Sequence, residues 1–185
     1  MTTDAAGKPE RSLWLWIPLA LFAVFFVLVM SGLLSPADRN VNSMMIGKPL
    51  PSFDLRPSVA DRPGLATTAF ADGKPRLLNI FASWCVPCAA EAPQLAALAA
   101  QGVEIDGIAI RDRPEDVAAF LQRYGNPYRR IGADDVSAVQ LAIGSSGVPE
   151  TFVIDGRGRI MHQHIGDIRP DDVATIVARL KEAAR

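Results

Sequence analysis

The chain has 185 residues, of which 49% are hydrophobic and 21% charged, and this excludes a disordered or collagen-like protein and fits one domain of ordinary size. Because 19 basic and 20 acidic residues give a net charge of −1, nucleic acid is not an expected partner. The presence of only two cysteines excludes a disulfide-rich scaffold, a four-cysteine zinc site and a cysteine-bound iron–sulfur cluster within one chain.

The first predicted element is an uncharged run of 22 residues, Leu13 to Leu34. A helix of this length covers about 33 Å, enough for the hydrocarbon core of a bilayer, which is about 30 Å thick. We therefore expect a cytoplasmic tail over 1–12, a transmembrane anchor over 13–34 and a polar tether over 35–45. The alternative is a signal peptide cleaved near Ser35-Pro36-Ala37, although the apolar run exceeds the usual length of about 7–15 residues.

Residues 46–185 are predicted to form one α/β domain that begins with a short edge strand at 53–55, followed by a loop. From Arg76 onward, apolar runs and helical spacing alternate. Strands are predicted at 77–81, 103–110, 151–154 and 159–165, and helices at 88–101, after Pro114, before Gly144 and after Pro170. The order β-α-β-α-(β)-α-β-β-α predicts a central mixed sheet, parallel at first and closed by an antiparallel hairpin, with helices on both faces.

The chemistry of the chain is expected at Cys85 and Cys88, which follow a predicted buried strand. Cys85 stands where the next helix begins, and there unpaired N–H groups and the helix dipole lower the pKa of a thiol. Cys88 lies about one helical turn further on, close enough to form a disulfide, and Pro87 suits and stiffens this first turn. The pair predicts a redox site in which Cys85 attacks a partner disulfide and Cys88 resolves the mixed disulfide.

Other uses of a Cys-x-x-Cys pair meet objections in this sequence. Haem attachment requires histidine after the second cysteine, where this chain has Ala89. Zinc requires two more ligands, but His162 and His164 have only one residue between them, where three to five are usual, so neither a metal nor a cofactor is expected. A structural disulfide closing so short a loop adds little stability. A copper-delivery protein using both cysteines and one histidine remains an alternative of another class.

The order of strand, Trp-Cys-x-x-Cys, helix and a later Val-Pro before a strand resembles the thioredoxin fold from about Ile46 to the C-terminus. More narrowly, the chain is similar to the membrane-anchored thiol:disulfide oxidoreductases of cytochrome c maturation, the CcmG/DsbE group. The residues that carry this resemblance are the anchor, Leu78-Asn79-Ile80-Phe81-Ala82-Ser83-Trp84-Cys85-Val86-Pro87-Cys88, Glu91, Gly147-Val148-Pro149-Glu150-Thr151-Phe152-Val153-Ile154-Asp155 and His162-x-His164-x-Gly166-Asp167.

The resemblance implies how a client polypeptide is bound. Val148-Pro149 matches a loop with a cis proline that packs against the cysteine pair. This loop would leave the backbone of Val148 free to pair with an extended client beside Cys85, as an added strand. Trp84 is expected to be a partly exposed platform for the partner. Client choice is expected to come from residues 148–150 and 52–75.

The chain departs from thioredoxins at Asn79, which lies six residues before Cys85, where they commonly have a buried acid. Asparagine cannot accept the proton of Cys88, so Asn79 is expected to be structural and another group must act as general base. Glu150, next to the proline, is the first candidate, and Glu91, three residues after Cys88, is the second.

The resemblance implies a protein-disulfide oxidoreductase in the inner membrane with its catalytic domain in the periplasm. Its clients would be apocytochrome c or a thiol protein of cytochrome maturation, and its electrons would come from a membrane thiol transporter. Such a reductase is needed because the compartment is oxidising, whereas haem attachment requires two free thiols. An anchored reductase or oxidant with other envelope clients remains the alternative.

Overall fold

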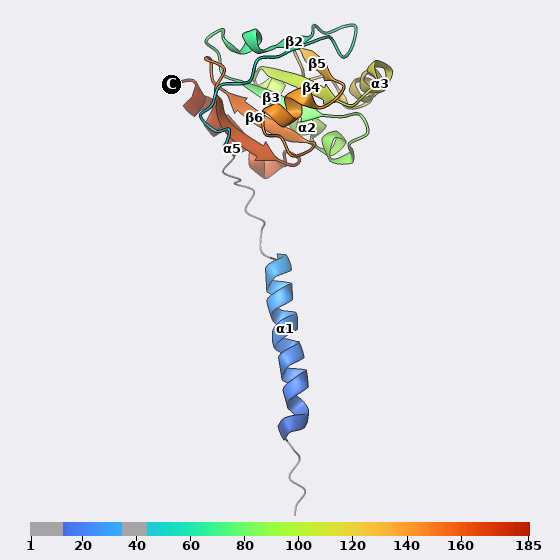
Figure 1. Cartoon of the computed structure of the whole chain (residues 1–185), viewed down its shortest axis with the longest axis vertical. Helices are drawn as coiled ribbons and strands as arrows, with labels where there is room; N and C mark the ends of the chain where they lie inside the picture. The colour runs from blue at the N-terminus through green and yellow to red at the C-terminus, as the bar shows by residue number, and fades with distance from the viewer. Residues whose placement is uncertain (1–12, 35–43) are drawn as a thin grey trace, which may run out of the picture. The chain divides into compact units, whose positions relative to one another are not determined.

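The computed structural model describes residues 13–34 and 44–185, without the side chains of Leu13, Leu15, Leu33 and Leu34 (Figure 1). The chain divides into two compact units, Met1–Asp38 and Arg39–Arg185. The cytoplasmic tail predicted for 1–12 lies outside the described residues. So does the tether predicted for 35–45, apart from its end after residue 43.

The first unit contains a 3-10 turn, Leu13–Trp16, followed by helix α1, Ile17–Leu34. Because the start of the apolar run forms this tighter turn, the α-helix covers 18 residues instead of the expected 22. Among residues 13–34 and 44–185, no helix has the length and apolarity needed to cross a membrane. The transmembrane helix predicted over 13–34 is therefore not supported by the structure.

A five-stranded sheet forms the centre of the second unit, with strand order β5-β4-β3-β6-β7. The strands are β3 (Arg76–Phe81), β4 (Ile105–Ile110), β5 (Ile131–Asp134), β6 (Glu150–Ile154) and β7 (Ile160–Ile165). The first three strands are parallel, and β6 and β7 are antiparallel to their neighbours. Every residue of the central strand β3 is buried. The predicted mixed sheet and its closing hairpin are confirmed.

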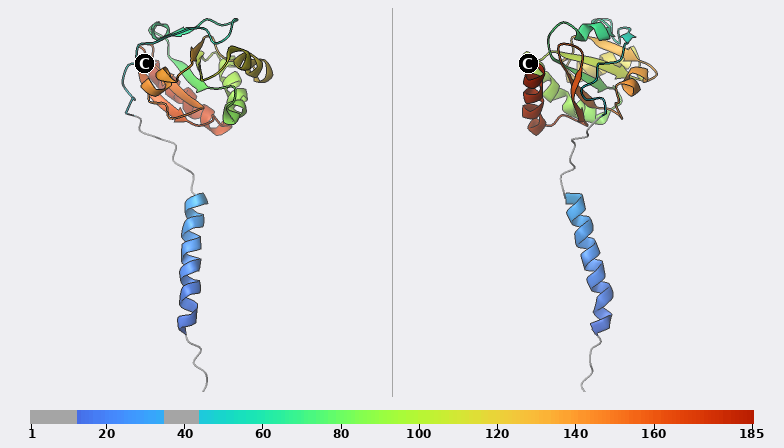
Figure 2. Two further views of the ribbon diagram at one scale, coloured as in Figure 1. Left: turned by 45° about the vertical axis from the view of Figure 1, so that its right-hand side comes forward. Right: turned by 60° about the vertical axis from the view of Figure 1, so that its left-hand side comes forward.

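Four helices accompany the sheet: α2 (Val86–Ala100), α3 (Pro114–Tyr124), α4 (Ala138–Ala142) and α5 (Pro170–Ala183). Helix α2 contacts both α3 and α5, and α5 also contacts β6 and β7. Figure 2 shows α5 in dark red along one side of the domain. Pro114 and Pro170 each stand at a helix start, where a missing N–H costs least. The helices around the sheet agree with the predicted thioredoxin-like α/β class.

The segment before β3, predicted as an edge strand at 53–55 followed by a loop, contains a second small sheet, so the strand is present and the loop holds its unpredicted partner. Strands β1 (Asp54–Leu55) and β2 (Leu65–Ala66) pair in antiparallel fashion, and a 3-10 turn, Thr67–Phe70, follows. Between them, residues 56–63 run along the outer edge of β5, where Ser58 N–H donates to the carbonyl of Ile131 at 3.0 Å. This pairing covers the free edge of the sheet. The expected role of residues 52–75 in client choice stays a prediction.

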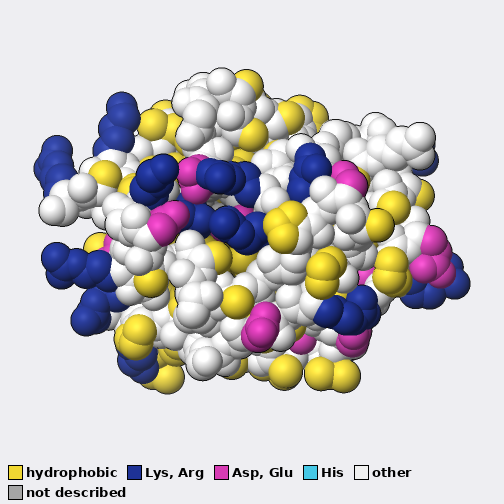
Figure 3. Space-filling model, turned by 90° about the horizontal axis from the view of Figure 1, so that it is seen from above, with side chains coloured by type: hydrophobic (Ala, Val, Ile, Leu, Met, Phe, Trp, Pro, Cys, Tyr) yellow, Lys and Arg dark blue, Asp and Glu magenta, His cyan; other side chains and the backbone are white. Residues whose placement is uncertain are grey.

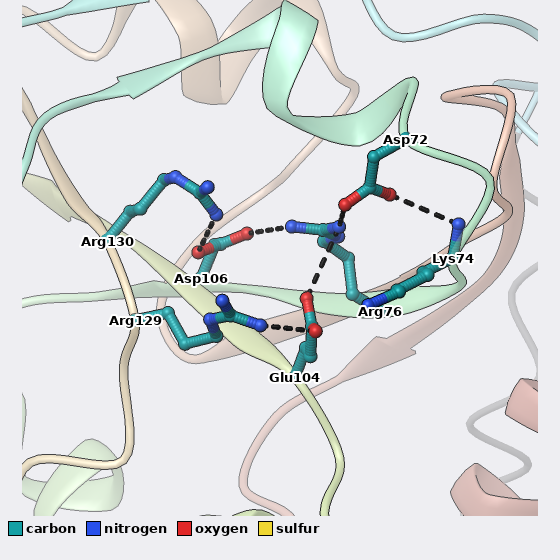
Figure 4. A network of polar contacts seen from close by, with 7 residues as sticks. All are labelled: Asp72, Lys74, Arg76, Glu104, Asp106, Arg129 and Arg130. Atoms are coloured by element: carbon teal, nitrogen blue, oxygen red, sulfur yellow. Dashed lines mark hydrogen bonds and ion pairs between the residues drawn. The ribbon is translucent and has the colours of Figure 1, made fainter.

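A buried charge network lies at the start of β3, the end of the strand away from the cysteines. The guanidinium of Arg76 is fully buried and pairs with Asp72, Glu104 and Asp106 (Figure 4). Burial raises the pKa of Asp106, while the nearby guanidinium groups of Arg130 and Arg76 oppose this rise. The network therefore depends on each charge keeping its partner.

The surface of the described domain mixes both signs of charge. Seen from above, Lys and Arg side chains lie beside Asp and Glu side chains (Figure 3). Among the exposed ion pairs of the described domain, Arg56 and Asp135 lie 2.9 Å apart. Exposed pairs of this kind contribute about 0–1 kcal/mol each, so they add little to the stability of the fold.

Candidate active site

Cys85 and Cys88 form a disulfide at the start of α2, with their Cα atoms 5.3 Å apart. Cys85 is the N-cap of the helix and Cys88 lies within its first turn, as the sequence predicts. Pro87 occupies one of the first two helical positions, where a backbone N–H has no acceptor within the helix, so the N–H that proline lacks is not needed. Both cysteine residues are buried, whereas the flanking Trp84 and Val86 are 58% and 81% exposed. A partner therefore meets an apolar surface around the disulfide.

The start of α2 distinguishes the two sulfurs. The backbone N–H of Cys88 donates to Sγ of Cys85 at 3.2 Å. A donor to sulfur stabilises negative charge, and the positive end of the helix dipole acts in the same direction. Cys88 lies within the first helical turn, so its sulfur is not at the N-cap position that Cys85 occupies. The arrangement favours Cys85 as the thiolate that attacks and Cys88 as the thiol that resolves.

The loop before Cys85 is fixed to the loop after β4. Asp112 accepts hydrogen bonds from the backbone N–H of Ser83 at 2.5 Å and from its hydroxyl at 2.7 Å. The indole N–H of Trp84 donates to the carbonyl of Arg111 at 3.3 Å. The sequence reading missed Asp112. One feature of the sequence indicates this contact. Ser83 and Asp112 each lie two residues beyond the end of a strand, and the two strands are parallel neighbours, so the two residues come close together.

The peptide bond between Val148 and Pro149 is cis, as the resemblance implied. Pro149 directly precedes β6, whose antiparallel pairing with β3 sets Glu150 opposite Ile80. The start of β6 therefore lies beside the end of β3, which leads to Cys85. Within residues 44–185, no backbone hydrogen bond occupies the N–H or C=O of Val148, so both can pair with a further strand.

Glu150 is buried and both of its carboxylate oxygens have partners. Oε1 accepts from the backbone N–H and the hydroxyl of Ser146, at 2.9 and 2.6 Å, and Oε2 accepts from Gln163 at 2.8 Å. These bonds join the loop before the cis proline to β7. Through these contacts Glu150 holds the loop before the cis proline against β7. Its predicted role as general base stays a prediction.

Glu91 is also fully buried, on α2 one turn after Cys88. Its carboxylate accepts from the Asn79 amide at 2.9 Å and from the backbone N–H of Ile168 at 3.0 Å. Burial raises the pKa of Glu91 to about 7, although both hydrogen bonds oppose the rise. This carboxyl group can therefore exchange a proton near neutral pH, and the Asn79 amide is one of its two hydrogen-bond donors.

The raised pKa predicts how stability depends on pH. Between the ordinary pKa of 4.5 and about 7, the unfolded chain loses the Glu91 proton while the folded chain keeps it, so stability falls as pH rises. The full shift corresponds to about 3 kcal/mol. In denaturant unfolding measured across this range, a Glu91→Gln variant is expected to lose that slope, whatever its absolute stability. An unchanged slope would place the titration elsewhere.

The structure does not bring together the two cysteines and the histidine that a copper-delivery protein would need. Among the described residues, no group of three or more His, Cys, Asp or Glu side chains could hold a metal ion. His164 lies on β7 with its Nε2 3.2 Å from the carbonyl oxygen of Asp167. Burial lowers the pKa of His162 on the same strand. The two histidines therefore belong to the sheet and its following turn.

Comparison with known proteins points to one kind of chemistry. Residues 45–180 match the Redoxin family. The thiol:disulfide interchange protein HelX of Rhodobacter capsulatus is 38% identical over 160 residues, which cover 85% of this chain and 89% of HelX. The thiol:disulfide interchange protein DsbE of Escherichia coli K12 is 38% identical over 162 residues, covering 84% and 86%. DsbE of Pseudomonas aeruginosa is 40% identical over 153 residues, covering 82% and 83%.

A solved structure shares the fold. The crystal structure of a putative thiol:disulfide interchange protein DsbE from Chlorobium tepidum superposes with a TM-score of 0.60 at 24% sequence identity. The match covers 76% of this chain and 98% of that chain. This likeness supports the thioredoxin-like architecture and carries no residue roles.

Proposed function

Because the chain belongs to the Redoxin family and is a protein-disulfide oxidoreductase, we propose that it reduces disulfides of apocytochrome c or of a thiol protein in cytochrome c maturation. The observation that carries this proposal is the Cys85–Cys88 disulfide at the start of α2, at the end of β3 that lies beside the cis Pro149. Thiol–disulfide exchange needs one sulfur to attack and a second to complete the reaction, and this pair supplies both.

In the proposed reaction, the Cys85 thiolate attacks one sulfur of the client disulfide, and the other client sulfur leaves as a thiolate that takes up a proton. Cys88 then transfers its proton to Glu91 and attacks Sγ of Cys85. This step breaks the mixed disulfide, and the second client thiolate leaves and takes the proton from Glu91. Two electrons pass to the client, and the protein is left in the disulfide form. A membrane thiol transporter is the proposed donor that restores the dithiol.

Glu91 fits the proton-accepting role better than Glu150. Its pKa of about 7 lets it take a proton and release it again under neutral conditions. It also lies one helical turn beyond Cys88 on the same helix. Glu150 is bound to three donors from the loop at 146 and from β7, which supports a role in shaping the proline loop.

Client binding is proposed to use the backbone of Val148 and the apolar surface around the disulfide. An extended client segment can pair with the loop backbone at Val148, just before β6, because the N–H and C=O of Val148 have no backbone partner among residues 44–185. The exposed rings and methyl groups of Trp84 and Val86 supply contact area beside Cys85. Main-chain pairing of this kind suits a client that is not yet folded.

The direction of electron flow is proposed from the carboxylates near the cysteines. Asp112 binds the residue two before Cys85, and Glu91 follows Cys88 by three residues. Negative charge disfavours a nearby thiolate, so it makes the reduced form less stable and lowers the reduction potential. The site is therefore expected to give up electrons, as a reductase does.

Measurement of the reduction potential tests this direction. The full chain, equilibrated with dithiothreitol buffers and read by thiol alkylation, is expected to have a potential near or below about −270 mV, in the range of reducing members of the fold. A potential near about −120 mV, typical of strongly oxidising members, would favour the alternative of an oxidant with other envelope clients.

The site of action is proposed to be the periplasmic side of the inner membrane. The described side chains of α1 include many large exposed apolar groups, such as Phe22 and Phe25, and no charged residue interrupts the run from Leu13 to Leu34. Although no described helix is long and apolar enough to cross a membrane, these exposed apolar side chains support attachment of the oxidoreductase domain to a membrane surface. A tethered reductase also meets membrane-bound assembly partners at a higher effective concentration.

A further inference from the structure

Tyr128 is a buried residue that the proposed reaction does not use. Its hydroxyl donates to Oδ1 of Asn79 at 2.7 Å. The amide of Asn79 donates to Oε1 of Glu91 and to Oγ1 of Thr151, each at 2.9 Å. Burial raises the pKa of Tyr128 well above its usual value, so its hydroxyl keeps its hydrogen. Side chains from α2, β3, β6 and the segment before β5 thus form one buried network.

The position of the Tyr128 ring is set by its neighbours. The ring stacks on Phe81 with centroids 4.8 Å apart and planes 15° apart. It lies over Gly107, where an added Cβ would come within 3.0 Å of both rings. Because Gly107 pairs with Asn79 in the sheet, the missing side chain lets the hydroxyl reach the amide. The guanidinium of Arg62 also donates to the carbonyl of Tyr128 at 3.0 Å.

The Tyr128 hydroxyl decides which end of the Asn79 amide faces Glu91. In the observed orientation, the hydroxyl hydrogen meets Oδ1 and the NH2 group faces the carboxylate. If the amide turned over, the hydroxyl hydrogen would face an NH2 group and the carboxylate would face an oxygen. We propose that Tyr128 is a positioning residue that acts through Asn79 to keep an N–H donor on Glu91.

This inference rests on the proposed role of Glu91 as proton acceptor. Burial and the negative charge of Asp167 raise the pKa of Glu91, while the N–H groups of Asn79 and Ile168 lower it. Without the Asn79 donor, the neutral form would be favoured further. Tyr128 thereby keeps Glu91 able to change protonation state near neutral pH when Cys88 loses its proton.

A Tyr128→Phe variant of the full chain in detergent micelles tests the inference. The carboxyl carbon of Glu91 is followed by NMR as a function of pH in the oxidised protein with ¹³C-labelled glutamate, and it is identified by its absence in Glu91→Gln. The midpoint in the unmodified chain is expected at about 7. In Tyr128→Phe the ring remains stacked but the amide is free to turn, so the midpoint is expected to rise by about one pH unit.

Tyr124→Phe is the matched control, because it removes a hydroxyl from a tyrosine at the end of α3 that is 38% exposed, and it is expected to leave the midpoint unchanged. Gly107→Ala keeps the Tyr128 hydroxyl but displaces the ring, so it is also expected to raise the midpoint. This variant is the test to use if Tyr128→Phe folds poorly. A midpoint in Tyr128→Phe equal to or below that of the unmodified chain overturns the inference alone. If Glu91 of the unmodified chain has no transition near neutral pH, its proposed role fails and the inference fails with it.

Discussion

Replacement of Cys88 by alanine is expected to stop turnover and to leave the client attached to Cys85 by a stable mixed disulfide. The first step needs only the Cys85 sulfur, which stands at the helix end and accepts the N–H of residue 88. The second step then lacks its intramolecular thiolate and depends on thiols from solution. Because intramolecular attack has a very high effective concentration, turnover is expected to fall by about 10³-fold or more.

The measurement is isolation of mixed disulfides from cells under non-reducing conditions, with identification of the trapped chain by mass spectrometry. Cys85→Ala is the matched control, since it removes one sulfur of the same pair but leaves only the sulfur inside the first helical turn. It is expected to be as inactive as Cys88→Ala and to trap nothing. Equal trapping by both variants would contradict the assignment of the attacking sulfur. Trapped envelope proteins without a link to cytochrome maturation would favour the alternative clients.

Loss of the Arg76 guanidinium is expected to give the largest change in stability. In Arg76→Met, the fully buried carboxylate of Asp106 and the largely buried one of Glu104 each lose a cation that lies 3.3 Å away. Asp106 keeps Arg130 at 3.6 Å and Glu104 keeps Arg129, so the loss is expected at the lower end of the about 3–5 kcal/mol that breaking a buried ion pair costs. The free energy of unfolding of the full chain, measured in guanidinium chloride by circular dichroism, is expected to fall by this amount.

Arg179→Met is the control for Arg76, because Arg179 forms an exposed pair with Glu182 at 2.9 Å and is expected to contribute about 0–1 kcal/mol. A second variant, Arg76→Met combined with Asp106→Leu, removes both buried charges and is expected to recover much of the loss. The deficit of the single variant is also expected to shrink at acid pH. Burial already raises the pKa of Asp106, and protonation removes the buried charge that has lost Arg76. A loss no larger than that of the control would show that the network is not a stabilising unit.

Most of the redox site could be predicted from the sequence, because the features that indicate it lie close together in the chain. The cysteine pair follows an apolar strand, and the spacing of three residues sets both sulfurs on one helical turn. The cis bond before Pro149 and the exposure of Trp84 followed from the resemblance and agree with the structure. Spacing in the sequence does not distinguish Glu150 from Glu91 as proton acceptor, because it does not show which hydrogen-bond donors meet each carboxylate.

The amino-acid sequence alone determined the strand and helix order, the mixed sheet and the position of the dithiol, because apolar periodicity, helix-start residues and short spacings act between near neighbours in the chain. Only the tertiary structure decided the environment of Glu91. Its partners Asn79 and Ile168 lie 12 and 77 residues away, and Tyr128 reaches Asn79 across 49 residues. Such contacts depend on strand register and on a gap in the side-chain packing at Gly107, and these arise only when distant segments pack together.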